Sequence, residues 1–184
     1  MNSDTSKILS RLENLCARRE YCCSEMMGKA LKALDGNREM AEELLSSLKD
    51  NGYVDDARYA AAFAREKSSL SGWGPVKIRF ALNAKGVDRQ VIDAALGEID
   101  EERAESRLEK LLQTKWKSLQ GDPQAKLKLI KFALGRGYEY DDVRKTVERI
   151  TSEDLKGQIC LNRYFSISWR SAINSNLLIL QKYL

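Results

Sequence analysis

The chain has 184 residues, of which 43% are hydrophobic and 32% charged, so it can bury a core beneath a polar surface. Its net charge of +4 is small, and the placement of charge is therefore more informative than the total. The sequence contains no histidine, the commonest general base near neutral pH and the commonest metal ligand. It also lacks a GxxxxGK[ST] phosphate loop and a GxGxxG turn. We therefore predict that the protein is not an enzyme and has no catalytic residues, cofactor or metal.

The cysteines and the apolar segments bear on the cellular compartment. Cysteines stand at positions 16, 22, 23 and 160 without paired CxxC spacing, which argues against a zinc site. The first ten residues are polar, and the apolar segment Asn176–Leu184 is too short to cross a bilayer. We expect reduced thiols, a cytoplasmic location and no membrane contact.

The first predicted unit, residues 6–52, contains three helices. Its apolar residues recur at intervals of three and four, which is the spacing of one helix face. Polar residues mark the helix starts, and a glycine marks the end of the last helix. The expected helices are Ser6–Arg19, capped by Asp4 or Thr5, then Cys22–Leu34, and a third that opens at Asn37 and ends near Gly52.

The second predicted unit, residues 53–99, repeats this pattern. Asp55 and Asp56 are a candidate metal or acid–base pair, but a helix cap combined with an ion pair to Arg58 is the preferred interpretation. Proline fits the first turn of a helix, where its missing N–H is not needed. The expected helices are Ala57–Ser69 after the cap Asp55, a helix that starts at Pro75 and ends at Gly86, and Gln90–Ile99 after the cap Asp88.

The third predicted unit, residues 100–150, precedes an atypical C-terminal tail at 151–184. The tail is richer in Ser, Asn and Ile than the units. It is compatible with one or two extra helices, with a disordered segment, or with a C-terminus translated from a shifted reading frame. The expected helices of the unit are Glu101–Leu119, then Gln124–Leu134 with Gly135 and Gly137 at its end, and Asp141–Ile150.

The three units align with one another at a spacing of 51 residues. Each triplet of helices is too small to bury its apolar face alone, so neighbouring units should stack. We predict an all-α fold of three tandem three-helix repeats in an elongated, curved array. The aligned apolar series include Ala41, Ile92 and Val143; Leu48, Ile99 and Ile150; and Met27, Ile78 and Leu129.

Basic residues concentrate in the second and third units. Residues 110–136 hold seven basic residues and one carboxylate, and residues 65–89 hold six and two. The spacing of 51 places Lys77 with Lys128 and Lys85 with Arg136, so we predict a stripe of cations along the array. This stripe would be a track for phosphates or for an acidic protein groove, although a solvated helix face has the same composition. The candidate contact residues are Lys77, Arg79, Lys85, Lys126, Lys128, Lys131 and Arg136.

Three aromatic residues accompany these cations: Trp73, Trp116 and Tyr138. Exposed aromatic rings beside cations stack nucleic-acid bases. A buried or half-buried position is nevertheless the stronger expectation for each of them.

Several segments resemble the RecX family. Residues 45–60, LSSLKDNGYVDDARYA, resemble the family pattern L-x-x-L-x-x-x-G-[YL]-[LVI]-D-D-x-R-[YF]-A. Residues 74–87, GPVKIRFALNAKGV, resemble G-x-x-x-I-x-x-x-L-x-x-K-G-[IV], and residues 131–138 are similar again. Near the start, residues 19–30 resemble R-E-x-S-x-x-E-L-x-x-K-L, with Cys22 in place of Ser and Ala30 in place of Leu. The resemblance covers roughly residues 8–150, and the tail departs from it.

The resemblance implies both a fold and a partner. RecX-like proteins consist of three tandem three-helix units, and they bind the RecA recombinase in the groove of its filament on single-stranded DNA. They limit filament growth, ATP hydrolysis and strand exchange, in DNA repair and recombination. By this resemblance we expect a monomeric regulator that inhibits RecA, with weak direct DNA binding as a secondary property. The resemblance supplies no catalytic residues.

Two other functions stay open at this point. A stand-alone helical DNA-binding regulator would bind duplex DNA tightly and selectively without RecA. A helical scaffold for other proteins would bind its partners without regard to salt or RecA.

Overall fold

The computed structural model describes residues 3–154, which form nine helices and no strand. Short loops connect successive helices. The bounds are α1 Ser3–Cys16, α2 Cys23–Ala33, α3 Arg38–Asp50, α4 Asp56–Ser69, α5 Pro75–Ala84, α6 Arg89–Gly97, α7 Glu101–Lys117 and α8 Ala125–Gly135, followed by a helix over residues 140–154.

The predicted caps of three helices are confirmed. The side chain of Asn37 accepts a hydrogen bond from the backbone N–H of Met40, and Asp88 accepts one from Gln90. Asp55 accepts from two N–H groups of α4. Each side-chain oxygen satisfies an N–H that has no partner inside its own helix.

Both ends of the array differ from the sequence prediction. The proposed caps Asp4 and Thr5 are wrong, because both lie inside α1, where Asp4 is an acidic residue of the first turn. At the other end, helix continues through Thr151 to residue 154 instead of stopping at Ile150. The rest of the predicted tail, with Cys160, lies outside the described residues.

Three separate hydrophobic clusters form the core, one for each set of three helices. Helices α1–α3, then α4–α6, then α7, α8 and the 140–154 helix each enclose one cluster. The 51-residue series supplies equivalent positions in all three, and Ala41, Ile92 and Val143 are fully buried. The predicted all-α repeat fold is thereby confirmed.

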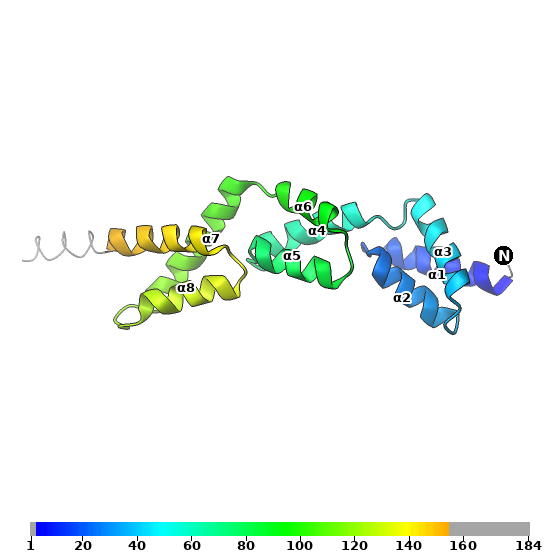
Figure 1. Ribbon diagram of the computed structural model, residues 1–184, viewed down its shortest axis with the longest axis horizontal. Coiled ribbons are helices and arrows are strands. Elements are labelled where there is room, and N and C mark those ends of the chain that lie inside the picture. Colours follow the sequence, from blue (N-terminus) through cyan, green and yellow to red (C-terminus); the bar gives the residue numbers. More distant parts are fainter. Residues whose placement is uncertain (1–2, 155–184) are drawn as a thin grey trace, which may run out of the picture.

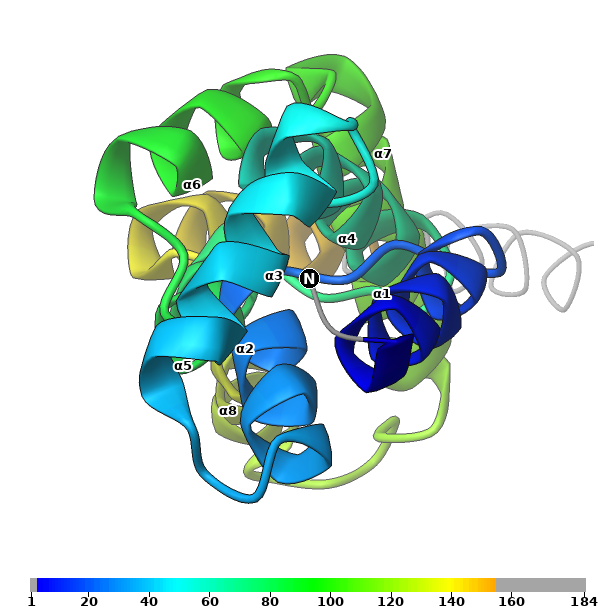
Figure 2. The same ribbon diagram turned by 90° about the vertical axis from the view of Figure 1, so that its right-hand side faces the viewer.

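The clusters follow one another along an elongated molecule (Figure 1). Helices α2, α5 and α8 lie along one side of it, the lower side in Figure 1, and they remain together in the end-on view of Figure 2. Equivalent helices therefore occupy equivalent positions, as stacking of repeats requires.

Candidate interaction surface

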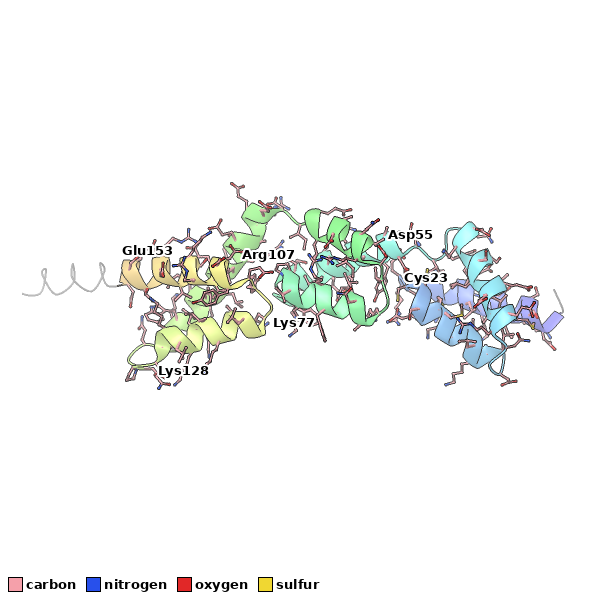
Figure 3. The ribbon with its side chains drawn as sticks, viewed as in Figure 1. Cys23, Asp55, Lys77, Arg107, Lys128 and Glu153 are labelled. Carbon is pink, nitrogen blue, oxygen red and sulfur yellow. The ribbon has the colours of Figure 1, made fainter. Side chains whose placement is uncertain are left out.

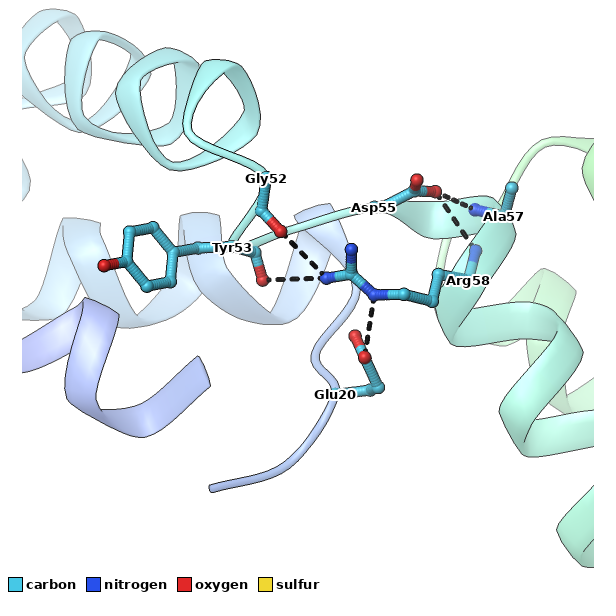
Figure 4. A network of polar contacts seen from close by, with 6 residues as sticks. All are labelled: Glu20, Gly52, Tyr53, Asp55, Ala57 and Arg58. Atoms are coloured by element: carbon cyan, nitrogen blue, oxygen red, sulfur yellow. Dashed lines mark hydrogen bonds and ion pairs between the residues drawn. The ribbon is translucent and has the colours of Figure 1, made fainter. Parts of the chain in front are cut away.

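The Asp55-Asp56-x-Arg58 segment joins the first and second clusters (Figure 4). Asp55 accepts from the N–H groups of Ala57 (2.7 Å) and Arg58 (3.1 Å), and these bonds hold the pKa of its carboxyl below the ordinary value. The Arg58 guanidinium pairs at 2.7 Å with Glu20, so the expected pairing with the adjoining carboxylates is wrong. It also donates to the carbonyls of Gly52 and Tyr53. The segment is structural in these contacts.

Two further contacts complete this first junction. The Asp56 carboxylate accepts from the backbone N–H of Cys23, at the start of α2, over 2.8 Å. The Lys85 ammonium, at the end of α5, pairs at 2.5 Å with Glu25 of α2. Burial opposes ionisation of Glu25, but the hydrogen bond and charge of Lys85 outweigh it and leave the pKa of Glu25 below its ordinary value. Side chains therefore carry the first junction.

Backbone groups contribute to the second junction, which hydrogen bonds from the side chains of Arg107 and Arg136 also cross. The N–H of Gly74 donates to the carbonyl of Arg136 (2.9 Å), and the N–H of Val76 donates to that of Gly137 (3.0 Å). These donors lie in the first turn of α5, and the acceptors follow the end of α8. Two helix ends thus satisfy each other's unpaired groups. A Cβ atom on Gly137 would lie 2.3 Å from the Cβ of Lys77, so the close approach requires glycine.

The predicted contact cations lie on or directly after α5 and α8, and most have intramolecular partners. Arg79 pairs with Asp93, and both side chains are exposed, so this ion pair is weak and readily exchanged. Lys128 pairs with Asp122, whose side chain is only 28% exposed. Lys85 is held by Glu25, and both side chains are only 29% exposed. Lys85 is therefore less available to a partner than the sequence suggests.

The remaining four cations differ in availability. Lys77 stands beside the second junction (Figure 3), with its ammonium 4.6 Å from the centre of the Trp73 ring. Arg136 donates to the carbonyl of Ser71 over 2.9 Å. Lys126 and Lys131 are exposed on α8 and have no ion pair or hydrogen bond within residues 3–154. These two lysines are the most available of the predicted residues.

Exposed apolar side chains accompany the lysines, and sequence reasoning did not identify them. Val76 and Phe80 of α5 are 42% and 76% exposed, and Leu127 and Leu134 of α8 are 49% and 40% exposed. Val76 corresponds to Leu127 and Phe80 to Lys131 at the 51-residue spacing. Intervals of four and seven residues align them along each helix. We call Val76, Phe80, Leu127, Lys131 and Leu134 the outer stripe.

The three aromatic candidates pack against the hydrophobic clusters. Trp73 lies against the second cluster and Trp116 against the third. Tyr138 is only 8% exposed. The expectation of buried or half-buried rings is confirmed for all three.

No metal-binding arrangement and no membrane-spanning helix is found among the described residues. No three His, Cys, Asp or Glu side chains converge there on a point that would hold an ion. No helix within residues 3–154 has the length and apolar character needed to cross a membrane.

Burial, and then the nearby Asp56 carboxylate, raise the pKa of the Cys23 thiol to about 11, so this thiol is protonated at neutral pH.

The fold defines a tandem helical-repeat protein with exposed apolar and cationic side chains on α5 and α8. Its residues 55–96 match the model of the second three-helix domain of RecX, and residues 101–147 match that of the third. Regulatory protein RecX of Escherichia coli strain SE11 is 28% identical over 148 residues, 76% of this chain and 89% of that protein. The chain is similar to the RecX family of regulatory proteins in these two domains and along most of its length.

Solved structures support the same fold. The crystal structure of RecX from Lactobacillus salivarius superposes with a TM-score of 0.72 at 21% identity, covering 82% of this chain and 99% of that one. A second crystal structure of a regulatory protein RecX gives a TM-score of 0.71 at 24% identity, over 79% and 72% of the two chains.

Proposed function

We propose that this protein binds the RecA recombinase, both free and assembled on single-stranded DNA, and inhibits its activity. Similarity to the RecX family supports this function, because the family consists of regulatory proteins. The observation that carries the proposal is the outer stripe, which lies on the second helices of the two domains that the family models match.

The chemistry of the outer stripe suits a protein partner. Phe80 is 76% exposed, and an exposed apolar side chain of this size beside others indicates a protein-binding surface. Lys126 and Lys131 add charge that favours an acidic partner and speeds its encounter. Arg79 joins them once its exposed carboxylate partner, Asp93, exchanges for a group on the recombinase.

The elongated shape explains how such contacts inhibit. A rod that presents equivalent stripes from two successive repeats contacts neighbouring subunits of a helical filament at once. Two linked contacts bind more tightly than either alone. The rod then blocks further assembly or promotes subunit loss, and ATP hydrolysis falls with the number of active subunits.

ATP hydrolysis by RecA on single-stranded DNA tests this proposal. We expect the protein to inhibit hydrolysis, and the variant Lys126→Glu/Lys131→Glu to require at least about tenfold more protein for the same inhibition. Lys32→Glu/Lys145→Glu is the matched control, because it makes the same charge change at exposed positions outside α5 and α8. Equal inhibition by both variants, or none by the unaltered chain, would refute the proposal.

The same samples separate the other two functions. Tight, selective binding to duplex DNA without RecA would support a stand-alone DNA-binding regulator. Binding to other proteins that ignores both salt and RecA would support a scaffold.

A further inference from the structure

A groove of about 630 Å³ opens at the second junction, and no residue of the outer stripe lines it. The loop after α4 forms one wall, and α7 with the end of α8 forms the other. Four charged residues line it, and all are cations: Arg107, Lys110, Lys115 and Arg136. Ser69, Ser71, Thr114 and Ser118 also line the groove, and the hydroxyls of Ser69, Thr114 and Ser118 donate to the backbone carbonyls of Arg65, Lys110 and Lys115. No carboxylate lies among its lining residues.

The two arginines are fixed by the walls of the groove. Arg107 donates to the hydroxyl of Ser68 over 3.0 Å, and Arg136 donates to the carbonyl of Ser71 over 2.9 Å. Neither side chain has a carboxylate within 4.0 Å among residues 3–154, so their charge is not neutralised there. Fixed and unneutralised cations in a concavity concentrate positive potential and attract anions.

The two lysines face the groove without a charged partner. Lys110 is exposed and forms no ion pair in the described part of the chain. The Lys115 ammonium lies 5.7 Å from the centre of the Phe132 ring, which also lines the groove. Cationic side chains suit phosphate oxygens, and the partly exposed Phe132 ring supplies apolar surface for a base.

We propose that this groove binds the sugar–phosphate backbone of single-stranded nucleic acid. Several cations in one channel match a chain of phosphates better than a single anion. A single strand is flexible enough to follow a concave groove. Duplex DNA is stiff over about 150 base pairs, so it would contact only the edges of the groove. The inference deepens the proposed function, because it names the component of a nucleoprotein filament that this groove contacts.

The test measures binding of a fluorescent oligothymidylate to the full chain by anisotropy, without RecA. We expect binding that weakens with salt and a several-fold loss in Lys110→Gln/Lys115→Gln. Each phosphate contact contributes about 0.7 to the slope of log affinity against log salt, so removal of two should flatten the slope by about 1.4. Lys32→Gln/Lys145→Gln, with the same loss of charge outside the groove, should change neither affinity nor slope by comparable amounts.

A labelling experiment guards against an indirect effect of the variants. An amine-reactive reagent should modify Lys110 and Lys115 less when oligothymidylate is bound, while Lys32 and Lys145 react as before. Equal losses in both double variants, or no protection of the groove lysines, would overturn the inference. So would tighter binding of the duplex or of ATP than of the single strand, or displacement of the oligonucleotide by oligoglutamate at equal charge.

The two proposals fail separately. The anisotropy experiment contains no recombinase, so its failure leaves inhibition of ATP hydrolysis intact. Unchanged inhibition by the α8 variant, with its oligothymidylate binding intact, would reject the outer stripe and leave the groove.

Discussion

Helices α2 and α5 are equivalent elements of successive repeats, yet their first turns are satisfied by different chemistry. At α2, the Asp56 carboxylate of the next repeat accepts from the N–H of Cys23. At α5, carbonyls of Arg136 and Gly137 in the next repeat accept from Gly74 and Val76. The first junction therefore depends on ion pairs and carboxylates. The second depends on backbone groups, on the space that glycine leaves, and on two arginines that donate to neutral acceptors. The same repeat supports one interface sensitive to pH and salt and one sensitive to shape.

The largest effect should come from filling the space at the second junction. In Gly137→Ala, the new Cβ overlaps Lys77, and alanine must also adopt a φ of +85°. We expect a loss of about 3 kcal/mol or more in the free energy of unfolding, measured by urea denaturation.

The control for this substitution is Gly121→Ala. Its φ is +84°, but no atom lies within 4 Å of the added Cβ, so it carries the backbone cost of about 1 kcal/mol alone. Equal losses in the two variants would show that the glycine contact does not constrain the junction.

A smaller loss is expected when the side-chain cap of α2 is removed. Asp56→Ala leaves the N–H of Cys23 without its acceptor, which should cost about 1 to 2 kcal/mol by urea denaturation. Asp56→Asn retains an acceptor oxygen and should recover most of this loss. Identical stabilities for the two variants would mean that the hydrogen bond contributes nothing.

Acid should loosen the first junction before the second. The pKa of Glu25 is lowered from 4.5, so its stabilising contribution is present above pH 4.5 and is lost as the pH falls through the lower folded-state value. The pKa of Lys85 is raised from 10.5 by Glu25, so its contribution is present below pH 10.5 and lost above the raised value.

Hydrogen exchange over a pH series, corrected for intrinsic rates, checks this prediction. Protection in α2 should fall in acid relative to protection at the start of α5. Lys85→Met should abolish the change in α2 protection between pH 7 and pH 3 that the titration of Glu25 causes. Parallel loss of protection at both junctions in the unaltered chain would contradict the assignment.

The smallest effect belongs to the exposed pair of Arg58 and Glu20, which are 44% and 36% exposed. Glu20→Gln should cost about 0.5 kcal/mol at low salt, because solvent screens such pairs. The cost should shrink further in 0.5 M NaCl, because the Debye length falls to about 5 Å or less at this ionic strength. A loss as large as that of Asp56→Ala would show that this pair, and not the cap, dominates the junction.

The sequence predicts those features that depend on nearby residues. Asn37, Asp55 and Asp88 are caps because their acceptors are two or three residues from the donors. The fully buried series of Ala41, Ile92 and Val143 follows from helical spacing and the repeat. Such local rules establish the helices and the repeat fold.

Contacts between repeats could not be predicted in this way. Lys85 was expected to contact another macromolecule, but it pairs with the carboxylate of Glu25, which lies 60 residues earlier in the chain, on another repeat. The exposure of Phe80 was missed, although it lies two residues from both Ile78 and Leu82, the buried residues of α5, and therefore on the opposite face of the helix. The second junction is signalled only by Gly74 and Gly137, whose role needs both partners in view.

The use of α5 and α8 as a single binding face is tested most directly by hydrogen exchange on the filament complex. With RecA assembled on single-stranded DNA, α5 and α8 should gain protection over the free protein, and α1 should gain much less. Phe80→Ser should remove the gain in α5 without unfolding the chain, because the side chain is exposed. Protection confined to α1–α3, with α5 and α8 exchanging as in the free protein, would contradict this binding face.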